Sequence, residues 1–169
     1  VPVLIVDSNW NDLRDARAAG IPVHHGEVLS ETVEYTLDLG GYGTLIAATD
    51  NDAYNTLVMN DYAFDFGRQN IFQIAPALRK PGTATEAAVT VSGRPMIASQ
   101  SAVSAYARGG QELGFSATRL SSKFTYSQLI DSKDARWSPV LAIRPDKSIL
   151  IAAADKPFAP DADDIVVGH

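Results

Sequence analysis

The residue most able to bind a ligand is Asp7, which directly follows the apolar residues 3–6. An acidic side chain at the carboxyl end of a parallel strand, with a helix after it, can accept hydrogen bonds from both hydroxyls of an adenosine ribose. The plainer interpretation is a carboxylate that caps the following helix or lies in a loop. The position of Asp7 therefore predicts a nucleotide contact, with capping as the alternative.

Polar residues also follow two other predicted strands. Gly26 and Glu27 come shortly after residues 21–24, and Thr49 begins a polar stretch after the apolar residues 44–48. Ligands of doubly wound sheets bind beyond the carboxyl ends of the strands, so polar residues at three such ends are what a nucleotide site needs, although any α/β protein places polar caps there. The predicted ligand-binding residues are Asp7, Ser8, Asn9, Gly26, Glu27, Thr49, Asp50 and Asn51.

Catalytic chemistry has no comparable set of residues. The only histidines are His24, His25 and His169, and the sequence has no G-x-S-x-G segment and no spaced set of Ser, His and Asp. We therefore expect no catalytic residues and a protein that is not an enzyme.

We also expect no metal site. Adjacent histidines at 24 and 25 point to opposite faces of an extended segment and cannot both reach one ion. The acidic residues Asp161, Asp163 and Asp164 lack the glycine and the closing glutamate of a calcium loop, so a solvated acidic turn is the expectation there.

An α/β framework has to position these residues. Up to residue 76, apolar strands alternate with amphipathic helices across short connections, which is typical of parallel strands joined by right-handed crossovers. The predicted strands are residues 3–6, 21–24, 44–48 and 70–74, and the predicted helices lie between Ser8 or Asn9 and Gly20, over 30–39 and over 52–66.

The pattern changes beyond Pro76, where residues 78–85 break the periodicity and indicate a linker. The predicted domains are residues 1–76 and 86–169, the first a Rossmann-like parallel sheet whose first strand is missing, the second a small α+β lobe. The lobe's predicted elements are strands at 89–91, 95–98 and 115–120, helices at 102–111 and 126–130, a hairpin of 140–143 with 149–151, and a closing strand at 165–167.

Composition excludes several classes of protein. The chain of 169 residues has 14 Lys and Arg against 20 Asp and Glu, a formal charge of −6, which argues against a nucleic-acid partner. It has no cysteine and hence no disulfide, and its longest apolar run, residues 149–154, is far short of a membrane span.

Three short motifs resemble the TrkA-type (RCK-type) nucleotide-binding domain. They are the strand ending in Asp7, the segment Gly26-Glu27-x-Leu29, and the strand followed by Thr49-x-x-Asp52-x-x-Asn55. The best match is the cytosolic tail of bacterial sodium/proton antiporters of the sodium/hydrogen exchanger family, whose small lobe has segments similar to residues 117–125 and 157–167. This sequence departs from the pattern in lacking a G-x-G-x-x-G unit and in having Glu27 where Asp is commoner.

The resemblance implies a non-catalytic sensor at the cytoplasmic face of the inner membrane. An adenine nucleotide, NAD(H), AMP or ATP, would bind at the strand ends and gate a monovalent cation:proton antiporter domain of the same polypeptide. The alternative is a fragment of a soluble NAD-dependent oxidoreductase. We further expect residues 3–6 and 44–48 either to pair directly or to be bridged by other residues, and the chain to form a homodimer through the large side chains of the predicted 52–66 helix: Tyr54, Leu57, Met59, Tyr62, Phe64 and Phe66.

Overall fold

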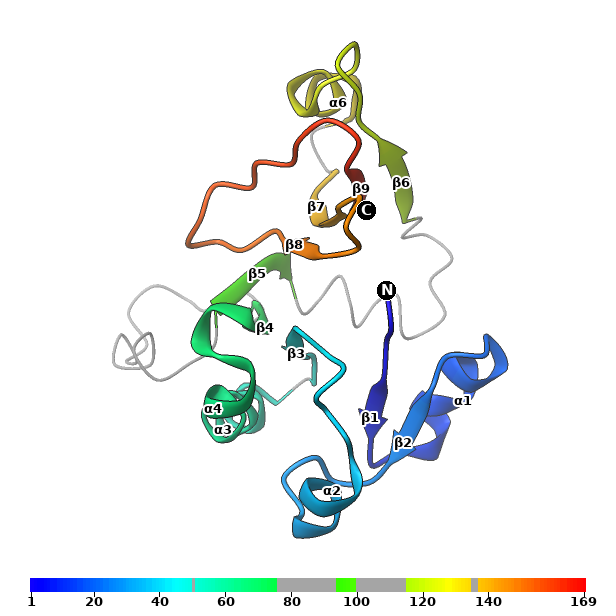
Figure 1. The fold of residues 1–169 in the computed structure, drawn as a ribbon, viewed down its shortest axis with the longest axis vertical. Coiled ribbons are helices and arrows are strands. Elements are labelled where there is room, and N and C mark those ends of the chain that lie inside the picture. The colour runs from blue at the N-terminus through cyan, green and yellow to red at the C-terminus, as the bar shows by residue number, and fades with distance from the viewer. Residues whose placement is uncertain (50, 76–93, 100–114, 135–136) are drawn as a thin grey trace.

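The computed structural model describes residues 1–49, 51–75, 94–99, 115–134 and 137–169. These residues form a mixed α/β fold with three small sheets (Figure 1). The predicted linker at 78–85, the strand at 89–91 and the helix at 102–111 lie outside the described residues. No helix in the described ranges is long and apolar enough to cross a bilayer.

Two of the sheets are parallel. One consists of β1 (Ile5–Asp7) and β2 (Val23–His25), and the other of β3 (Leu45–Ala47), β4 (Ile71–Ala75) and β5 (Arg94–Ser99). Ile5 lies opposite Val23 in the first sheet, and Leu45 lies opposite Ile71 in the second. The parallel pairing predicted from the alternation of strands and helices is confirmed for these pairs.

The strand β5 joins the parallel sheet beside β4, although the sequence analysis placed residues 95–98 in the second lobe. The predicted boundary at 76–85 lies outside the described residues and stays a prediction.

The strands β1 and β3 belong to different sheets, so the expected direct pairing of residues 3–6 with 44–48 is wrong for the described chain. In β1, the Ile5 N–H donates to the Pro22 carbonyl at 3.1 Å and the Asp7 carbonyl accepts from the Gly26 N–H at 2.9 Å. Because backbone groups alternate in direction along a strand, those of Val6 point away from β2. The edge of β1 that faces away from β2 thus remains unpaired within the described residues.

The helices of this half are α1 (Trp10–Ala18), α2 (Glu31–Thr36), α3 (Asp52–Asp61) and α4 (Ala63–Phe66), with a 3₁₀ turn η1 (Arg68–Asn70) before β4. The predicted 52–66 helix is broken at Tyr62, whose hydroxyl donates to the Val28 carbonyl at 2.8 Å. The predicted 30–39 helix ends at Thr36, because Leu37 turns extended and Leu39 packs on the core beneath α3. Tertiary packing overrides the helical pattern in both places.

From residue 115 onward, the described elements agree with those predicted from the sequence. Its elements are β6 (Ser116–Arg119), α6 (Tyr126–Ser132), β7 (Pro139–Ile143), β8 (Ile149–Ile151) and β9 (Ile165–Gly168). The strands form one antiparallel sheet in the order β6-β9-β7-β8. Leu129 of α6 packs on this sheet beside Leu120, Ala142 and Val166.

The acidic turn before β9 differs from its prediction, because Asp164 is buried rather than solvated. Its carboxylate accepts a hydrogen bond from the Asp161 N–H at 2.9 Å, and its carbonyl accepts from the Leu120 N–H at 2.8 Å. The turn is therefore held by a buried, hydrogen-bonded carboxylate.

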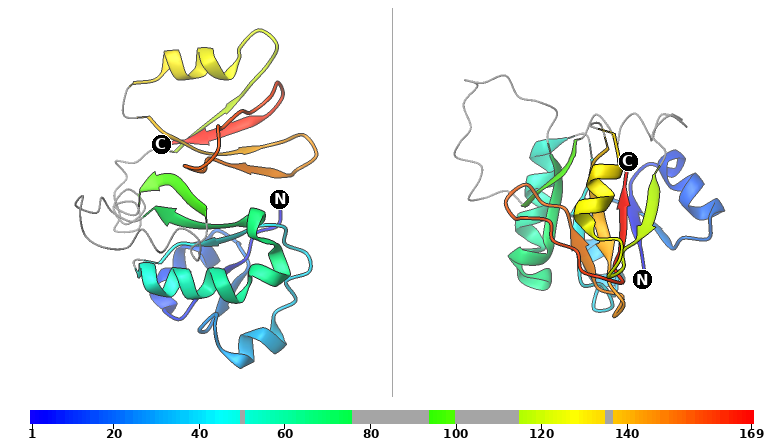
Figure 2. Two further views of the ribbon diagram at one scale, coloured as in Figure 1. Left: turned by 90° about the vertical axis from the view of Figure 1, so that its left-hand side faces the viewer. Right: turned by 90° about the horizontal axis from the view of Figure 1, so that it is seen from above.

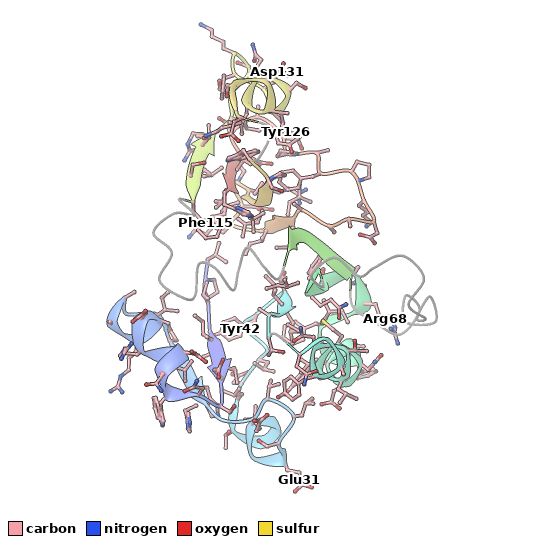
Figure 3. All side chains as sticks on the ribbon, turned by 180° about the vertical axis from the view of Figure 1, so that it is seen from behind. Glu31, Tyr42, Arg68, Phe115, Tyr126 and Asp131 are labelled. Carbon is pink, nitrogen blue, oxygen red and sulfur yellow. The ribbon has the colours of Figure 1, made fainter. Side chains whose placement is uncertain are left out.

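The two halves meet where β5 lies next to β7 and where Phe72 of β4 packs against Ile151 and Ala153. The antiparallel sheet thus lies beyond the β5 side of the parallel strands (Figure 2). Figure 3 shows the resulting length of the molecule, with α6, marked by Tyr126 and Asp131, at the opposite end from α2, marked by Glu31.

Candidate functional site

The carboxyl end of β1 is a tight polar turn. One oxygen of the half-buried Asp7 carboxylate accepts a hydrogen bond from the Asn9 N–H at 2.7 Å. Asn9 in turn caps α1 by accepting from the Asn11 N–H at 3.0 Å. The capping alternative for Asp7 is thus partly realised, since this carboxylate closes the turn that begins the helix. Within the described residues its second oxygen, Oδ2, has no recorded hydrogen bond, so an acceptor remains for a ligand hydroxyl.

The end of β2 lies directly beside this turn. His25 is the register partner of Asp7, and the His25 Nε2 atom is 2.9 Å from the Ser8 carbonyl oxygen. A Cβ atom at Gly26 would lie 3.3 Å from the His24 ring, so a larger residue there would press on that ring. These contacts fix the backbone of residues 7–9 against that of residues 25 and 26.

Glu27 connects this edge with α3. Its carboxylate accepts a hydrogen bond from the Tyr54 hydroxyl at 2.8 Å. Burial, and after it the hydrogen bond and the negative charge of Glu27, raise the pKa of Tyr54 to about 12. The phenol therefore stays protonated at neutral pH and holds the exposed Glu27 carboxylate in one place.

The end of β3 is a hydrogen-bonded network around Asn55, which is only 1% exposed. The Thr49 N–H and the Thr49 hydroxyl donate to Asn55 Oδ1 at 3.1 and 2.7 Å, and Asn55 Nδ2 donates back to the Thr49 carbonyl at 2.9 Å. Asn51 caps α3 by accepting from the Ala53 and Tyr54 N–H groups, both at 3.1 Å. The loop after β3 is thus rigidly held over the first turn of α3.

Tyr54 links the separate strand ends into one arrangement, because its N–H bonds to Asn51 while its hydroxyl bonds to Glu27. Seven of the eight predicted residues are described, and Asp50 lies outside the described residues. Hydrogen bonds, together with the covalent chain from Gly26 to Glu27, connect the turn after β1 with the loop after β3. The connected residues are Asp7, Ser8, Asn9, His25, Gly26, Glu27, Tyr54, Asn51, Thr49 and Asn55.

The chemistry of this edge is that of recognition. Asp7 and Glu27 supply carboxylates, which accept hydrogen bonds from hydroxyls and repel phosphate placed directly beside them. Within the described ranges no three His, Asp or Glu side chains gather closely enough to hold a metal ion.

Tyr54 and Asn55 are the positioning residues that the sequence analysis did not assign. Asn55 stood in the third motif without a role, and its spacing of four from Asn51 puts both on adjacent turns of α3. No local signal marks Tyr54, because its partner Glu27 is 27 residues away in the chain.

Comparison with known proteins adds little to this geometry. No protein-family model matches the sequence, and no curated protein matches it. Among solved structures the chain is similar to the RCK domain of GsuK, with 14% identity over 98% of this chain and 43% of that one, and a TM-score of 0.36. The chain spans less than half the length of that solved chain, and a TM-score of this size is too low to establish a common fold.

Proposed function

We propose that this chain is a regulatory domain that binds an adenine nucleotide at the carboxyl ends of β1, β2 and β3. The observation that carries the proposal is that hydrogen bonds join the end of β1 to the end of β2 through Ser8 and His25, and join Glu27, two residues further along the chain, to the loop after β3 through Tyr54. Such a preformed polar edge lowers the ordering cost of binding a small polar ligand.

The ligand proposed is NAD(H), AMP or ATP, with the ribose hydroxyls at Asp7. The carboxylate of Asp7 would repel a 2′-phosphate, so NAD is expected to bind better than NADP. We propose that the parallel strands β2-β1 and β3-β4-β5 are two parts of one Rossmann-like sheet.

The proposed role is control of a monovalent cation:proton antiporter domain in the same polypeptide, at the cytoplasmic face of the inner membrane. Control of this kind needs only a binding free energy that differs between two conformations, so the domain requires no acid, base or nucleophile.

We also propose that the domain acts as a homodimer. Of the large side chains on α3 and α4, Met59 and Tyr62 are used in the monomer's own core, whereas Leu57 is 59% exposed and Phe64 is 97% exposed. These two side chains are the candidates for a surface between copies.

Calorimetric titration with NAD, NADP, AMP and ATP tests the nucleotide proposal. We expect Asp7→Ala to weaken AMP and NAD binding about 10-fold or more, since a hydrogen bond to a charged group is lost. Asp7→Asn keeps an acceptor for the Asn9 N–H and removes the charge, so it should abolish the preference for NAD over NADP. Asp15→Ala on the exposed face of α1 is the control. Equal affinities in the wild type and both Asp7 variants would refute the ribose assignment.

A further inference from the structure

The side chains of Trp10 and His25 are stacked at the same edge of the molecule. Trp10 is the first residue of α1 and His25 is the last residue of β2. Their ring centroids are 4.4 Å apart and the ring planes differ by 8°. We propose that this stack, here termed the aromatic platform, binds the purine base of the nucleotide, an inference that rests on the proposed function and adds the base subsite to it.

The aromatic platform is built by elements that hold it without a ligand. His25 is fixed by its pairing opposite Asp7 and by the contact of its Nε2 atom with the Ser8 carbonyl oxygen at 2.9 Å. Trp10 follows the capping residue Asn9 and is held by the first turn of α1. The backbones of both residues are therefore held in regular elements, the His25 ring is held by Ser8 and the Trp10 ring by its stack on His25, which reduces the entropy lost when a third ring is added.

Trp10 does not belong to the buried face of α1. Leu13, on the same helix, is 0% exposed and supplies its buried contact, whereas Trp10 is 53% exposed. Because one face of the indole lies against His25, the opposite face contributes to the exposed part. A large, fixed and half-exposed aromatic face is a suitable surface for an offset-stacked planar ring.

The location matches the geometry of a nucleoside. His25 is the register partner of Asp7, so the aromatic platform adjoins the carboxylate proposed to bind the ribose. A purine has two fused rings, like indole, and it carries no charge at neutral pH. The carboxylates of Asp7 and Asp12 beside this edge therefore tolerate a base there but disfavour a phosphate.

The affinities are measured by calorimetry, and the intrinsic fluorescence of the wild-type chain, which has two tryptophans, Trp10 and Trp137, shows whether the ligand lies against Trp10. Trp137 lies in the second half, where its Nε1–H donates to the Ser116 hydroxyl at 3.2 Å. AMP, adenosine and ribose 5-phosphate are titrated against the wild type, Trp10→Leu and Trp10→Phe. Phe115→Leu, at a side chain of similar exposure (47%) in the second half, is the matched control.

We expect AMP and adenosine to quench the fluorescence of Trp10. Trp10→Leu should weaken AMP binding about 10-fold and Trp10→Phe only about 3-fold, because a ring is kept. Phe115→Leu should match the wild type, and ribose 5-phosphate should not distinguish the Trp10 variants from it.

The remaining outcomes separate the two proposals. If AMP binds the wild type and Trp10→Leu equally while Asp7→Ala still weakens it, the aromatic platform is refuted and the nucleotide site stands. If adenosine binds in a Trp10-dependent way but AMP does not bind, the platform stands and the proposed nucleotide function is refuted. If neither compound binds the wild type, both are overturned.

Discussion

The two halves of the molecule satisfy their backbone and their polar groups in different ways. The second half has four strands in one sheet, with a core in which Leu120, Leu129, Ala142 and Val166 are each 1% exposed or less. The first half divides its strands between two sheets, and Ile46 of β3 is 41% exposed. The second half thus forms one continuous sheet with a core of its own, whereas the first half has, within the described residues, the unpaired edge of β1 and polar strand ends to which other groups can bind.

The acidic residues follow the same division. Asp164 in the second half is buried and closes a turn through the Asp161 N–H, so its carboxylate has a structural role. In the first half, one oxygen of Asp7 accepts from the Asn9 N–H and one oxygen of Glu27 accepts from the Tyr54 hydroxyl. Both carboxylates lie at the edge where the three strand ends are linked. Asp7 and Asp164 both close a turn, but Asp164 is buried whereas Asp7 and Glu27 are partly or fully exposed, so the latter two are the better candidates for ligand binding.

The largest loss of folding stability is expected from a substitution in the core of the second half. Leu129→Ala removes a side chain that is 1% exposed, and a change of this kind costs about 2–5 kcal/mol of the free energy of unfolding. Ile130→Ala, at the neighbouring residue that is 40% exposed, should cost less than about 1 kcal/mol. Urea denaturation measures both, and equal losses would contradict the placement of Leu129 in the closed core of the second half.

A smaller effect is expected at the end of β3. Asn55→Ala removes the amide group that bonds to the Thr49 N–H, hydroxyl and carbonyl, at a cost of about 1–3 kcal/mol. Asn60→Ala is the matched control on the same helix, since its side chain makes a single bond, to the Thr56 carbonyl at 2.9 Å. A loss at Asn55 no greater than that at Asn60 would show that the network does not hold the loop.

We expect the first half to form a homodimer through its exposed apolar side chains on α3 and α4. Phe64→Ser should shift the sedimentation-equilibrium mass at micromolar concentration from dimer toward monomer, because it replaces a ring that is 97% exposed. Ile130→Ser in the second half should leave the mass unchanged. A monomeric mass for the wild type would remove the homodimer from the account.

The smallest effect is a pH dependence confined to alkaline solution. The pKa of Tyr54 is raised to about 12 in the folded chain, so the folded state holds its proton more tightly than the unfolded state. The resulting stabilisation is complete below pH 10 and is lost as the pH rises toward 12. Tyrosinate absorbance should show a late-titrating component that is lost in Tyr54→Phe and shifted to lower pH in Glu27→Gln, whereas the raised pKa of Tyr126, which burial causes, should be unaffected by either change. A titration unchanged by either variant would contradict the Tyr54–Glu27 contact.

Much of the local structure could be predicted from the sequence. The apolar runs predicted the first four strands of the first half, and the hairpin of β7 with β8 follows from two apolar runs around the turn at Pro145 and Asp146. Asn9 and Ser30 cap α1 and α2. This could be predicted because the side-chain oxygens of Asn and Ser accept hydrogen bonds from the free N–H groups of a helix's first turn.

The contacts between distant segments could not be predicted. Tyr62, where α3 ends, bonds to the Val28 carbonyl, which is 34 residues away, and Glu27 bonds to Tyr54, which is 27 residues away. β5 pairs with β4, although nothing in the residue pattern of β5 distinguishes it from a strand of the second lobe. In each case a partner distant in sequence decides the outcome, and periodicity contains no information about that partner.

The central claim is that a nucleotide binds at the linked strand ends of the first half and not to the second half. Amide chemical shifts of the isotope-labelled chain, recorded during titration with AMP, test it most directly. We expect the largest changes of amide chemical shift at residues 7–9, 25–27, 49 and 51, and no change in the amide shifts of β6, β7 and β9. Saturating AMP that leaves these residues unshifted, or that perturbs the antiparallel sheet instead, would contradict it.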